Sequence, residues 1–266
     1  MPETSAKDRV LADLAAESDQ LESWVADLDD AGWDTVTTPE GWTVKHQLGH
    51  LMWTDRASLA AIAGGEEWDA LLALGQADPT TFVDRETERM AELASESMLH
   101  HWQSSRERLA SALAAVPDGT KIPWFGPPMS AASMGTARLM ETWAHGRDVA
   151  QALGIVAPQD DRCRHVCHLG VRTRGFAYAV RGLEVPDVEV HVALTGPSGD
   201  LWTWGSPDAP ERVTGSGYDF ALLATRRRAL VDCDVHAEGA AAQEWLGIVQ
   251  AFAGLPGADP RPLADR

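Results

Sequence analysis

The sequence predicts an α+β protein in which an N-terminal antiparallel four-helix bundle is followed by a small α+β domain. Two observations support this prediction. Long segments with apolar residues at helical spacing fill the first part of the chain, whereas short strand-like segments occur only after Pro158. We therefore expect a bundle domain over residues 1–158 and a second domain over residues 159–266, and 266 residues are enough for both.

The bundle helices are delimited by capping residues and helix breakers. Thr43 is suited to cap the second helix, and Gly64 begins the glycine pair that ends it. A loop containing Trp68 and Pro79 leads to a long third helix rich in Glu and Arg, and Gly154 is the expected C-cap of the fourth. The four helices are expected at residues 6–28, 43–63, 80–116 and 131–153.

The second domain shows a different pattern. The segment VEVHVAL alternates apolar and polar residues, and the turn TGPSGD separates it from LWTW. Two more segments, ERVTG and ALVDCDVHAEG, are also strand-like. Short antiparallel strands mixed with helices are typical of a small α+β domain. Its helices are expected near residues 162–180, 218–225 and 240–252.

The composition excludes two classes of partner. The chain has 40 acidic and 22 basic residues, a net charge of −18 and a pI near 4.8. Such a surface repels nucleic acid and anionic lipid, so we expect neither a nucleic-acid partner nor a membrane. No apolar run is long enough to span a bilayer, and MPETSAKDRV contains no apolar signal segment. Because three cysteines are too few for a disulfide framework, we expect a soluble cytoplasmic protein.

Two helices carry residues suited to metal binding. Glu141 and His145 are four residues apart in METWAHGRD, so both side chains lie on one face of the fourth helix, one turn apart. His46 and His50 have the same spacing on the second helix. His50 has the more apolar neighbours, so we expect it to point inward as the third ligand, with His46 as an orienting or surface residue. Imidazole and carboxylate ligands suit Zn²⁺ and similar ions, and three of them leave a position open for catalysis.

Spacing alone also fits a plainer interpretation. A Glu–His pair four residues apart on a helix is often a surface ion pair, and a histidine beside leucines is often a buried core residue. The apolar neighbours of Glu141 and His145 favour an inward position, where an acid needs a partner. These neighbours are Leu139, Met140, Trp143 and Val149. Periodicity leaves the choice between the two interpretations open.

The segments GWTVKHQLGHLMWTDR and METWAHGRDVAQALG resemble the DinB/YfiT-like metal-binding bundle superfamily, and more closely its mycothiol-dependent maleylpyruvate isomerase family. The resemblance implies that His50, Glu141 and His145 bind a divalent metal, most often zinc. Asp148 completes the Glu-x-x-x-His-x-x-Asp motif. It is a candidate for orienting a ligand imidazole, although it can equally be a solvated charge.

The resemblance extends into the second domain. GSGYDFALLATRR loosely matches a helix of the family that is followed by an arginine near the active site, and Arg227 is the counterpart by position. The family usually has glycine before this arginine, whereas this chain has Arg226. Arg227 is expected to pair with a substrate carboxylate as a bidentate clamp.

The resemblance also implies the reaction. Mycothiol or another low-molecular-weight thiol would bind the open positions of the metal and be deprotonated there. The thiolate would attack a small electrophile, as in an isomerase or an S-transferase. Two alternatives stay open at this stage. One is a hydrolase that uses metal-activated water, and the other is a protein that binds metal and a small ligand without turnover.

Overall fold

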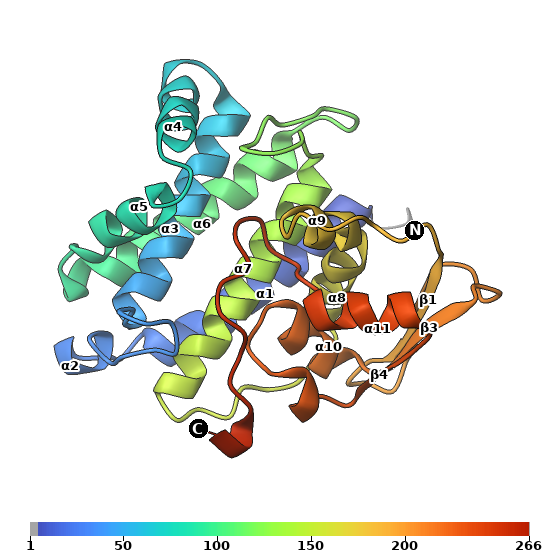
Figure 1. Ribbon diagram of the computed structural model, residues 1–266. Helices are drawn as coiled ribbons and strands as arrows, with labels where there is room; N and C mark the ends of the chain where they lie inside the picture. Colours follow the sequence, from blue (N-terminus) through green and yellow to red (C-terminus); the bar gives the residue numbers. More distant parts are fainter. Residues whose placement is uncertain (1–4, 266) are drawn as a thin grey trace. The chain divides into compact units, whose positions relative to one another are not determined.

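The computed structural model describes residues 5–265. The chain forms two compact units, the first ending at Ala157 and the second beginning at Pro158. The first unit is helical, and the second contains a four-stranded sheet with helices (Figure 1). The predicted α+β fold class, a helix bundle followed by a small α+β part, is confirmed.

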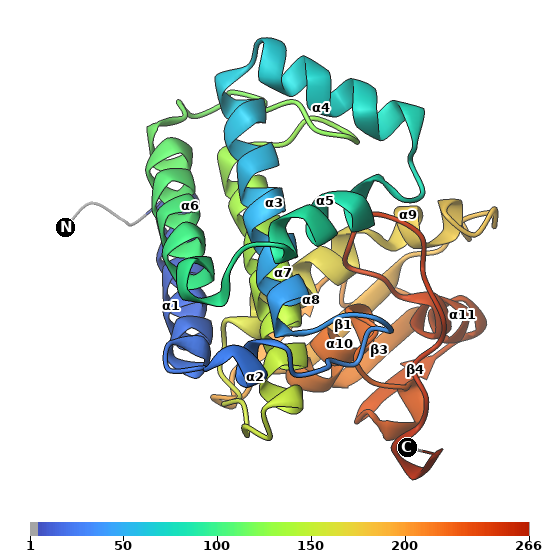
Figure 2. The ribbon, with the colours of Figure 1, turned by 90° about the vertical axis from the view of Figure 1, so that its left-hand side faces the viewer.

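Four long helices form the bundle of the first unit (Figures 1 and 2). Lys7, near the start of α1, donates to the carbonyl of Ala114 at the end of α6 (3.1 Å), so these two helices are antiparallel. Helices α3 and α7 are also antiparallel, whereas α3 and α6 run in the same direction (Figure 2). One long crossover connection therefore links α3 to α6. The four helices are α1 (Ala6–Val25), α3 (Val44–Ala63), α6 (Ser95–Ala115) and α7 (Ala131–Ala152).

The crossover contains helices that the sequence pattern does not predict. Where a loop around Trp68 was expected, α4 (Glu66–Ala77) forms instead. The expected single helix over residues 80–116 is divided into α5 (Phe82–Ala91) and α6, because Ala94 adopts an extended conformation (φ −62°, ψ 139°). A further short helix, α2 (Asp30–Trp33), follows α1. No Gly or Pro marks the break at Ala94, so local propensity does not reveal it.

Helix α5 packs closely on α3 at Gly49. A Cβ atom there would lie 3.0 Å from the carbonyl oxygen of Thr87 and 3.2 Å from the backbone nitrogen of Ala91. Only glycine allows the two helices to approach to this distance without displacement. This close packing accounts for α5 lying against α3 instead of forming one continuous helix with α6.

Apolar side chains from the four long helices fill the interior of the first unit. One core cluster, centred on α1, α3 and α6, also includes Trp33 of α2 and Val149 of α7. The cluster consists of Leu21, Val25, Trp33, Val44, Leu48, Leu51, Met52, Met98, Trp102 and Val149.

Capping hydroxyls define two of the helix ends, because the Ser5 and Ser130 side chains accept hydrogen bonds from the first-turn backbone (3.0 and 3.1 Å).

The second unit contains a sheet with strand order β2-β1-β3-β4. We predicted antiparallel strands, and the pairings of β1 with β2 and of β3 with β4 are antiparallel, but β1 and β3 are parallel, with Val190 opposite Glu211. The prediction missed this because β2 already brings the chain back to the end of the sheet where β1 begins, and residues 205–210 carry it to the other side of β1 at that same end. The strands are β1 (Val190–Thr195), β2 (Leu201–Trp204), β3 (Glu211–Ser216) and β4 (Val235–Glu238).

Helices of the second unit fall close to the predicted segments. The expected helix over residues 162–180 is interrupted at Thr173, and the start of the strand-like ALVDCDVHAEG segment is a 3-10 turn. The elements are α8 (Cys163–Arg172), α9 (Arg174–Ala179), α10 (Gly217–Ala224), η1 (Leu230–Asp232), α11 (Ala240–Ile248) and η2 (Leu263–Asp265).

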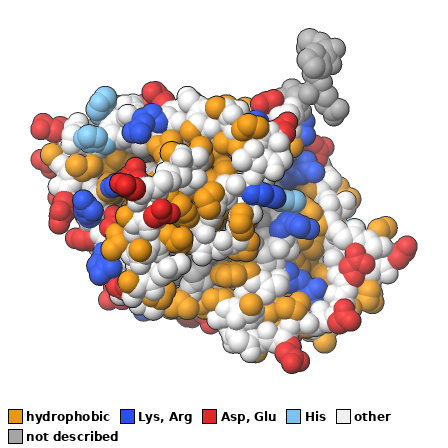
Figure 3. Space-filling model, turned by 90° about the horizontal axis from the view of Figure 1, so that it is seen from above, with side chains coloured by type: hydrophobic (Ala, Val, Ile, Leu, Met, Phe, Trp, Pro, Cys, Tyr) orange, Lys and Arg blue, Asp and Glu red, His pale blue; other side chains and the backbone are white. Residues whose placement is uncertain are grey.

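Within residues 5–265, no helix has both the length and the apolar character needed to cross a membrane. Acidic and apolar side chains are interspersed on the face shown in Figure 3.

Candidate metal centre

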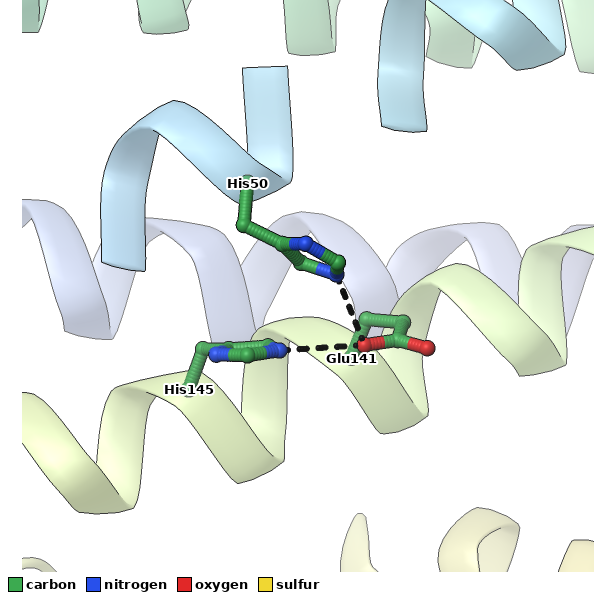
Figure 4. Close-up of side chains that lie close together, drawn as sticks. All are labelled: His50, Glu141 and His145. Carbon is green, nitrogen blue, oxygen red and sulfur yellow. Dashed lines mark hydrogen bonds and ion pairs between the residues drawn. The ribbon is translucent and has the colours of Figure 1, made fainter. Parts of the chain in front are cut away.

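Three side chains from two helices converge inside the bundle (Figure 4). His50 extends from α3, and Glu141 and His145 extend from α7. One nitrogen or oxygen atom of each lies within 4.8 Å of the others. The Nε2 atoms of His50 and His145 lie 3.4 and 3.1 Å from the same oxygen, Oε2 of Glu141. The structure thus brings together the three residues that the sequence predicts as ligands.

Helix geometry explains this convergence. Glu141 and His145 are one turn apart on α7, so both side chains leave the same face. Helix α3 runs antiparallel to α7 and presents His50 from the opposite side. Both histidines are only 8% exposed, so water screens the cluster weakly.

Glu141 is the charged member of the cluster. Burial raises the pKa of its carboxyl group, but hydrogen bonds and charge from His145 and His50 outweigh burial. The net effect holds the pKa of Glu141 well below its ordinary range, so the carboxylate is ionised at neutral pH. An ionised carboxylate is the form that binds a divalent cation.

The spacing of the three groups fits a small divalent cation. A tetrahedral zinc ion with bonds of about 2.0–2.1 Å to nitrogen and oxygen keeps its ligand atoms about 3.3 Å apart. Two of the three separations, 3.4 and 3.1 Å at Glu141 Oε2, are close to this value, and all three ligand atoms lie within 4.8 Å of one another. Because the groups fit such an ion, His50, Glu141 and His145 are suited to hold it.

The other ring nitrogen of each candidate ligand also has a partner. Nδ1 of His145 forms a short hydrogen bond with Oε1 of Gln47, and Nδ1 of His50 lies 3.3 Å from Oγ1 of Thr87. Gln47 is fully buried, and Thr87 is 1% exposed. Such partners orient an imidazole and fix which nitrogen faces a metal. Sequence spacing did not identify either residue.

His46 lies outside the cluster. Its Nδ1 accepts a hydrogen bond from the backbone N–H of Thr43 (3.2 Å), so its Nε2 carries the proton and donates to Glu88 (2.9 Å). Both nitrogens are therefore engaged at the start of α3, which explains why His50 rather than His46 faces Glu141. We expected His46 to be an orienting or surface residue, and the structure shows it capping the helix.

Trp42 is a neighbour of the cluster that sequence reasoning did not single out. Its indole ring stacks on His145, with ring centroids 5.8 Å apart and an angle of 17° between the planes. The same ring lies 5.6 Å from His50 and 6.3 Å from His46. Trp42 belongs to the Gly-Trp pair at the start of the motif GWTVKHQLGHLMWTDR, but the spacing of the candidate ligands does not show that its ring lies beside them.

The structure describes two further predicted functional residues, Asp148 and Arg227, each within its own unit. Asp148 is buried on α7, one turn beyond His145, while Gln47 is the partner at Nδ1 of that histidine. Arg227 follows α10 in the second unit, and its guanidinium donates to the carbonyl of Thr225 (2.7 Å). Arg226 has a left-handed backbone (φ 62°), the conformation that glycine adopts most easily. The change from the glycine usual in the family therefore alters the side chain while the backbone keeps a glycine-like turn.

The fold and the side-chain cluster together define a helix-bundle protein with a candidate divalent-metal centre between α3 and α7. Residues 14–150 match the model of the mycothiol maleylpyruvate isomerase N-terminal domain. The chain therefore belongs to this family, which confirms the resemblance inferred from the sequence motifs.

Two curated proteins and two crystal structures are similar to this chain. Uncharacterized protein MT0041 of Mycobacterium tuberculosis, strain CDC 1551 / Oshkosh, is 52% identical over 247 residues, which cover 93% of this chain and 96% of the relative. Uncharacterized protein Rv0036c, from a second strain, has the same identity and coverage. Crystal structures of the mycothiol-dependent maleylpyruvate isomerase and of a histidine-to-alanine variant align with a TM-score of 0.59 at 17% identity. They cover 87% of this chain and 92% of their own, and at this identity they show the fold.

Proposed function

We propose that this protein binds a divalent cation, with zinc favoured, through His50, Glu141 and His145, and uses a low-molecular-weight thiol as co-substrate. The thiol favoured by the family is mycothiol, and the reaction is an isomerisation or an S-transfer on a small electrophile. The approach of both Nε2 atoms to one oxygen of Glu141 (3.4 and 3.1 Å) is the observation that carries the metal assignment. Family membership and the mycothiol-dependent isomerase among the structural neighbours support the thiol.

The residues of the chain have distinct roles in this proposal. His50 and His145 contribute neutral nitrogen ligands, and Glu141 contributes one negative charge, so the site keeps a net positive charge for an anionic sulfur. A bound divalent cation would lower the pKa of a thiol that ligates it. Three protein ligands leave a position for that thiol. Trp42 covers the His145 side of the cluster and excludes water there.

Two further residues belong to the proposal. Arg227 would neutralise a carboxylate of the electrophile, because its planar guanidinium suits bidentate pairing with a carboxylate. Asp148 would help to orient His145 from the next turn of α7. Arg227→Ala is expected to raise KM for a carboxylate-bearing electrophile, whereas Asp148→Asn is expected to weaken metal binding.

The metal assignment is tested by elemental analysis of protein purified without an affinity metal. The expected result is close to one divalent ion per chain, lost in His50→Ala and in Glu141→Gln. A chain that retains its metal in both variants would contradict the proposed ligands. Gln103→Leu is a matched control, because it removes an interhelical hydrogen bond from Gln103 to Glu22 (2.7 Å).

The thiol is tested by activity measurements on the metal-loaded protein with thiol and electrophile mixtures. Turnover that requires the thiol and disappears in His50→Ala supports the proposal. Metal-dependent hydrolysis without thiol would favour the hydrolase alternative. Bound metal without turnover on any mixture would favour a binding protein.

A further inference from the structure

We infer that Gln47 is a positioning residue that sets the protonated nitrogen of His145 and, through the same hydrogen-bonded chain, holds Trp42 against the ligand cluster. This inference rests on the proposed metal function, because it concerns how one of the proposed ligands is oriented. Gln47 is fully buried and connects α3, α7 and the turn before α3.

The direction of each hydrogen bond in this chain can be assigned by starting from the backbone carbonyl of Trp42, which can only accept. The backbone carbonyl of Trp42 accepts a hydrogen bond from Oγ1 of Thr37 (3.1 Å). A hydroxyl has one proton to donate, so Oγ1 of Thr37 must accept in its contact with Nε2 of Gln47 (2.7 Å). The Gln47 amide is thereby oriented with its nitrogen toward Thr37 and its oxygen toward His145.

This orientation determines the tautomer of His145. Oε1 of Gln47 accepts only, so Nδ1 of His145 must carry a proton and donate to it. In the neutral imidazole, Nε2 is then left with its lone pair. Nε2 lies 3.1 Å from Glu141 Oε2, on the side where the three candidate ligands meet (Figure 4), so its lone pair can bind a metal ion or, in the metal-free chain, a second proton that is donated to Glu141.

The same chain holds Trp42. Its carbonyl oxygen also accepts a hydrogen bond from the backbone N–H of Thr37 (2.8 Å), so Thr37 contacts this oxygen twice. A bridge between Val36 and Thr43 closes the turn around them. The indole of Trp42 stacks on His145, the residue at the other end of the chain of hydrogen bonds. Gln47 therefore links the tautomer of His145 to the position of the ring that covers it.

The two histidine ligands differ in this respect. Thr87 is the partner of His50 at Nδ1 (3.3 Å), and a hydroxyl can donate or accept there. Thr87 therefore does not impose a tautomer by itself, whereas Gln47 does. Replacement of Gln47 should affect His145 specifically.

Gln47→Leu tests this role, because leucine fills a similar volume without an amide. In long-range ¹H–¹⁵N NMR spectra of the metal-free, full-length chain, the wild type should show His145 protonated at Nδ1, and Gln47→Leu should lose this preference. Zinc affinity, measured by competition with a chelator, should fall about 10–100-fold in Gln47→Leu. Gln47→Glu keeps an acceptor for Nδ1–H, so it should retain the tautomer and bind zinc more tightly than Gln47→Leu.

Thr37→Val provides a second test that leaves Gln47 and all proposed ligands in place. Without the hydroxyl, the amide of Gln47 loses the contact that orients it, so His145 should populate both tautomers. The matched control, Gln103→Leu, should leave both the tautomer and the zinc affinity unchanged.

The outcomes separate this inference from the proposed function. An unchanged Nδ1–H tautomer and unchanged zinc affinity in Gln47→Leu would overturn the positioning role. If Gln47→Leu fails to fold, an unchanged single tautomer in Thr37→Val would overturn it instead. A wild-type chain that binds no zinc would overturn the proposed function, while the tautomer measurement on metal-free protein would still decide the orientation of His145.

Discussion

Two polar groups join α3 to α7 about one turn apart, and they differ in whether they contain an arginine, whose positive charge is permanent. The first is the cluster of His50, Glu141 and His145. The second is the ion pair of Asp55 and Arg138, in which Nε of Arg138 lies 3.1 Å from Oδ1 of Asp55. The ion pair is the more sheltered from water, with side-chain exposures of 4% and 7%, compared with 10% for each histidine and 22% for Glu141 in the cluster.

The ion pair is complete without a ligand. Ser105 donates to the other oxygen of Asp55 (3.1 Å), and Arg138 also reaches the carbonyl of Leu51 (3.4 Å). Burial raises the pKa of Asp55, although Arg138 and Ser105 oppose this effect. A buried carboxylate with an arginine at one oxygen and a hydroxyl at the other has no need of a further cation.

When both histidines are neutral and carry their proton at Nδ1, the cluster consists of groups that accept at the point where they meet. Glu141 is an ionised carboxylate, and a neutral imidazole presents a lone pair at Nε2 when Nδ1 carries the proton. Three such groups facing one point need a proton or a metal ion between them. Both groups join the same two helices, and the residue types distinguish the ion pair, which has its own arginine, from the cluster, which we propose as a cation site.

Removing one partner of the ion pair is expected to have the largest effect on stability. Arg138→Met leaves the Asp55 carboxylate buried without its cation, and we expect the free energy of unfolding to fall by about 3–5 kcal/mol. Urea denaturation of the metal-free chain measures this loss. The double variant Asp55→Leu/Arg138→Met removes both charges and should recover most of it. A single variant as stable as the wild type would show that the pair is not needed.

Removing a metal from the cluster is expected to have the next largest effect. With free zinc at about 100 to 1,000 times Kd, the wild type should gain about 2.7–4.1 kcal/mol of stability. Denaturation with zinc and with excess chelator measures the difference. Glu141→Gln should show little zinc dependence, and Arg138→Met should keep it if it folds. Equal zinc dependence in the wild type and in Glu141→Gln would contradict the assigned ligand.

Parts of this arrangement were accessible from sequence and others were not. The spacing of Glu141 and His145 predicts a shared helix face, because i and i+4 residues lie one turn apart. The roles of Gln47 and Trp42 depend on contacts between helices and a turn, which no local spacing encodes. The orienting partner proposed from the motif was Asp148, whereas the structure adds Gln47 at Nδ1 of His145.

The same limit applies to the fold. The long helices follow from apolar periodicity, whereas the break at Ala94 follows from the packing of α5 on Gly49, far away in sequence. The parallel pairing of β1 and β3 depends on the path of the chain after β2, and strand-like alternation does not specify direction. In both units, the local sequence pattern predicts individual helices and strands, whereas long-range contacts determine how these helices pack and how these strands pair.

The close packing of α5 on α3 allows a test on the His50 side of the cluster that changes helix packing without replacing any candidate ligand. In Gly49→Ala the added Cβ would lie 3.0 Å from the carbonyl oxygen of Thr87, so α5 must shift, at a cost of about 1–3 kcal/mol. The shift should also move Thr87 away from His50 and weaken zinc binding. Gly146→Ala is the matched control on α7, because its Cβ would meet Trp24 at 3.6 Å, an ordinary contact. The control should be neutral or slightly stabilising, since alanine favours a helix over glycine.

The smallest expected effect concerns Asp78, a carboxylate near the surface that neither the ion pair nor the cluster includes. Hydrogen bonds from the Thr81 hydroxyl and backbone N–H lower its pKa, with a smaller contribution from Thr80. Because the pKa is lower in the folded chain, the ionised group stabilises the fold above its ordinary value of about 3.9, and this stabilisation is lost as the pH falls through the lowered pKa. Asp78→Asn should therefore be slightly less stable than the wild type at pH 6, and the difference should vanish in denaturation curves near pH 2. A difference that persists at low pH would assign the effect to hydrogen-bond geometry at the start of α5 rather than to the charge.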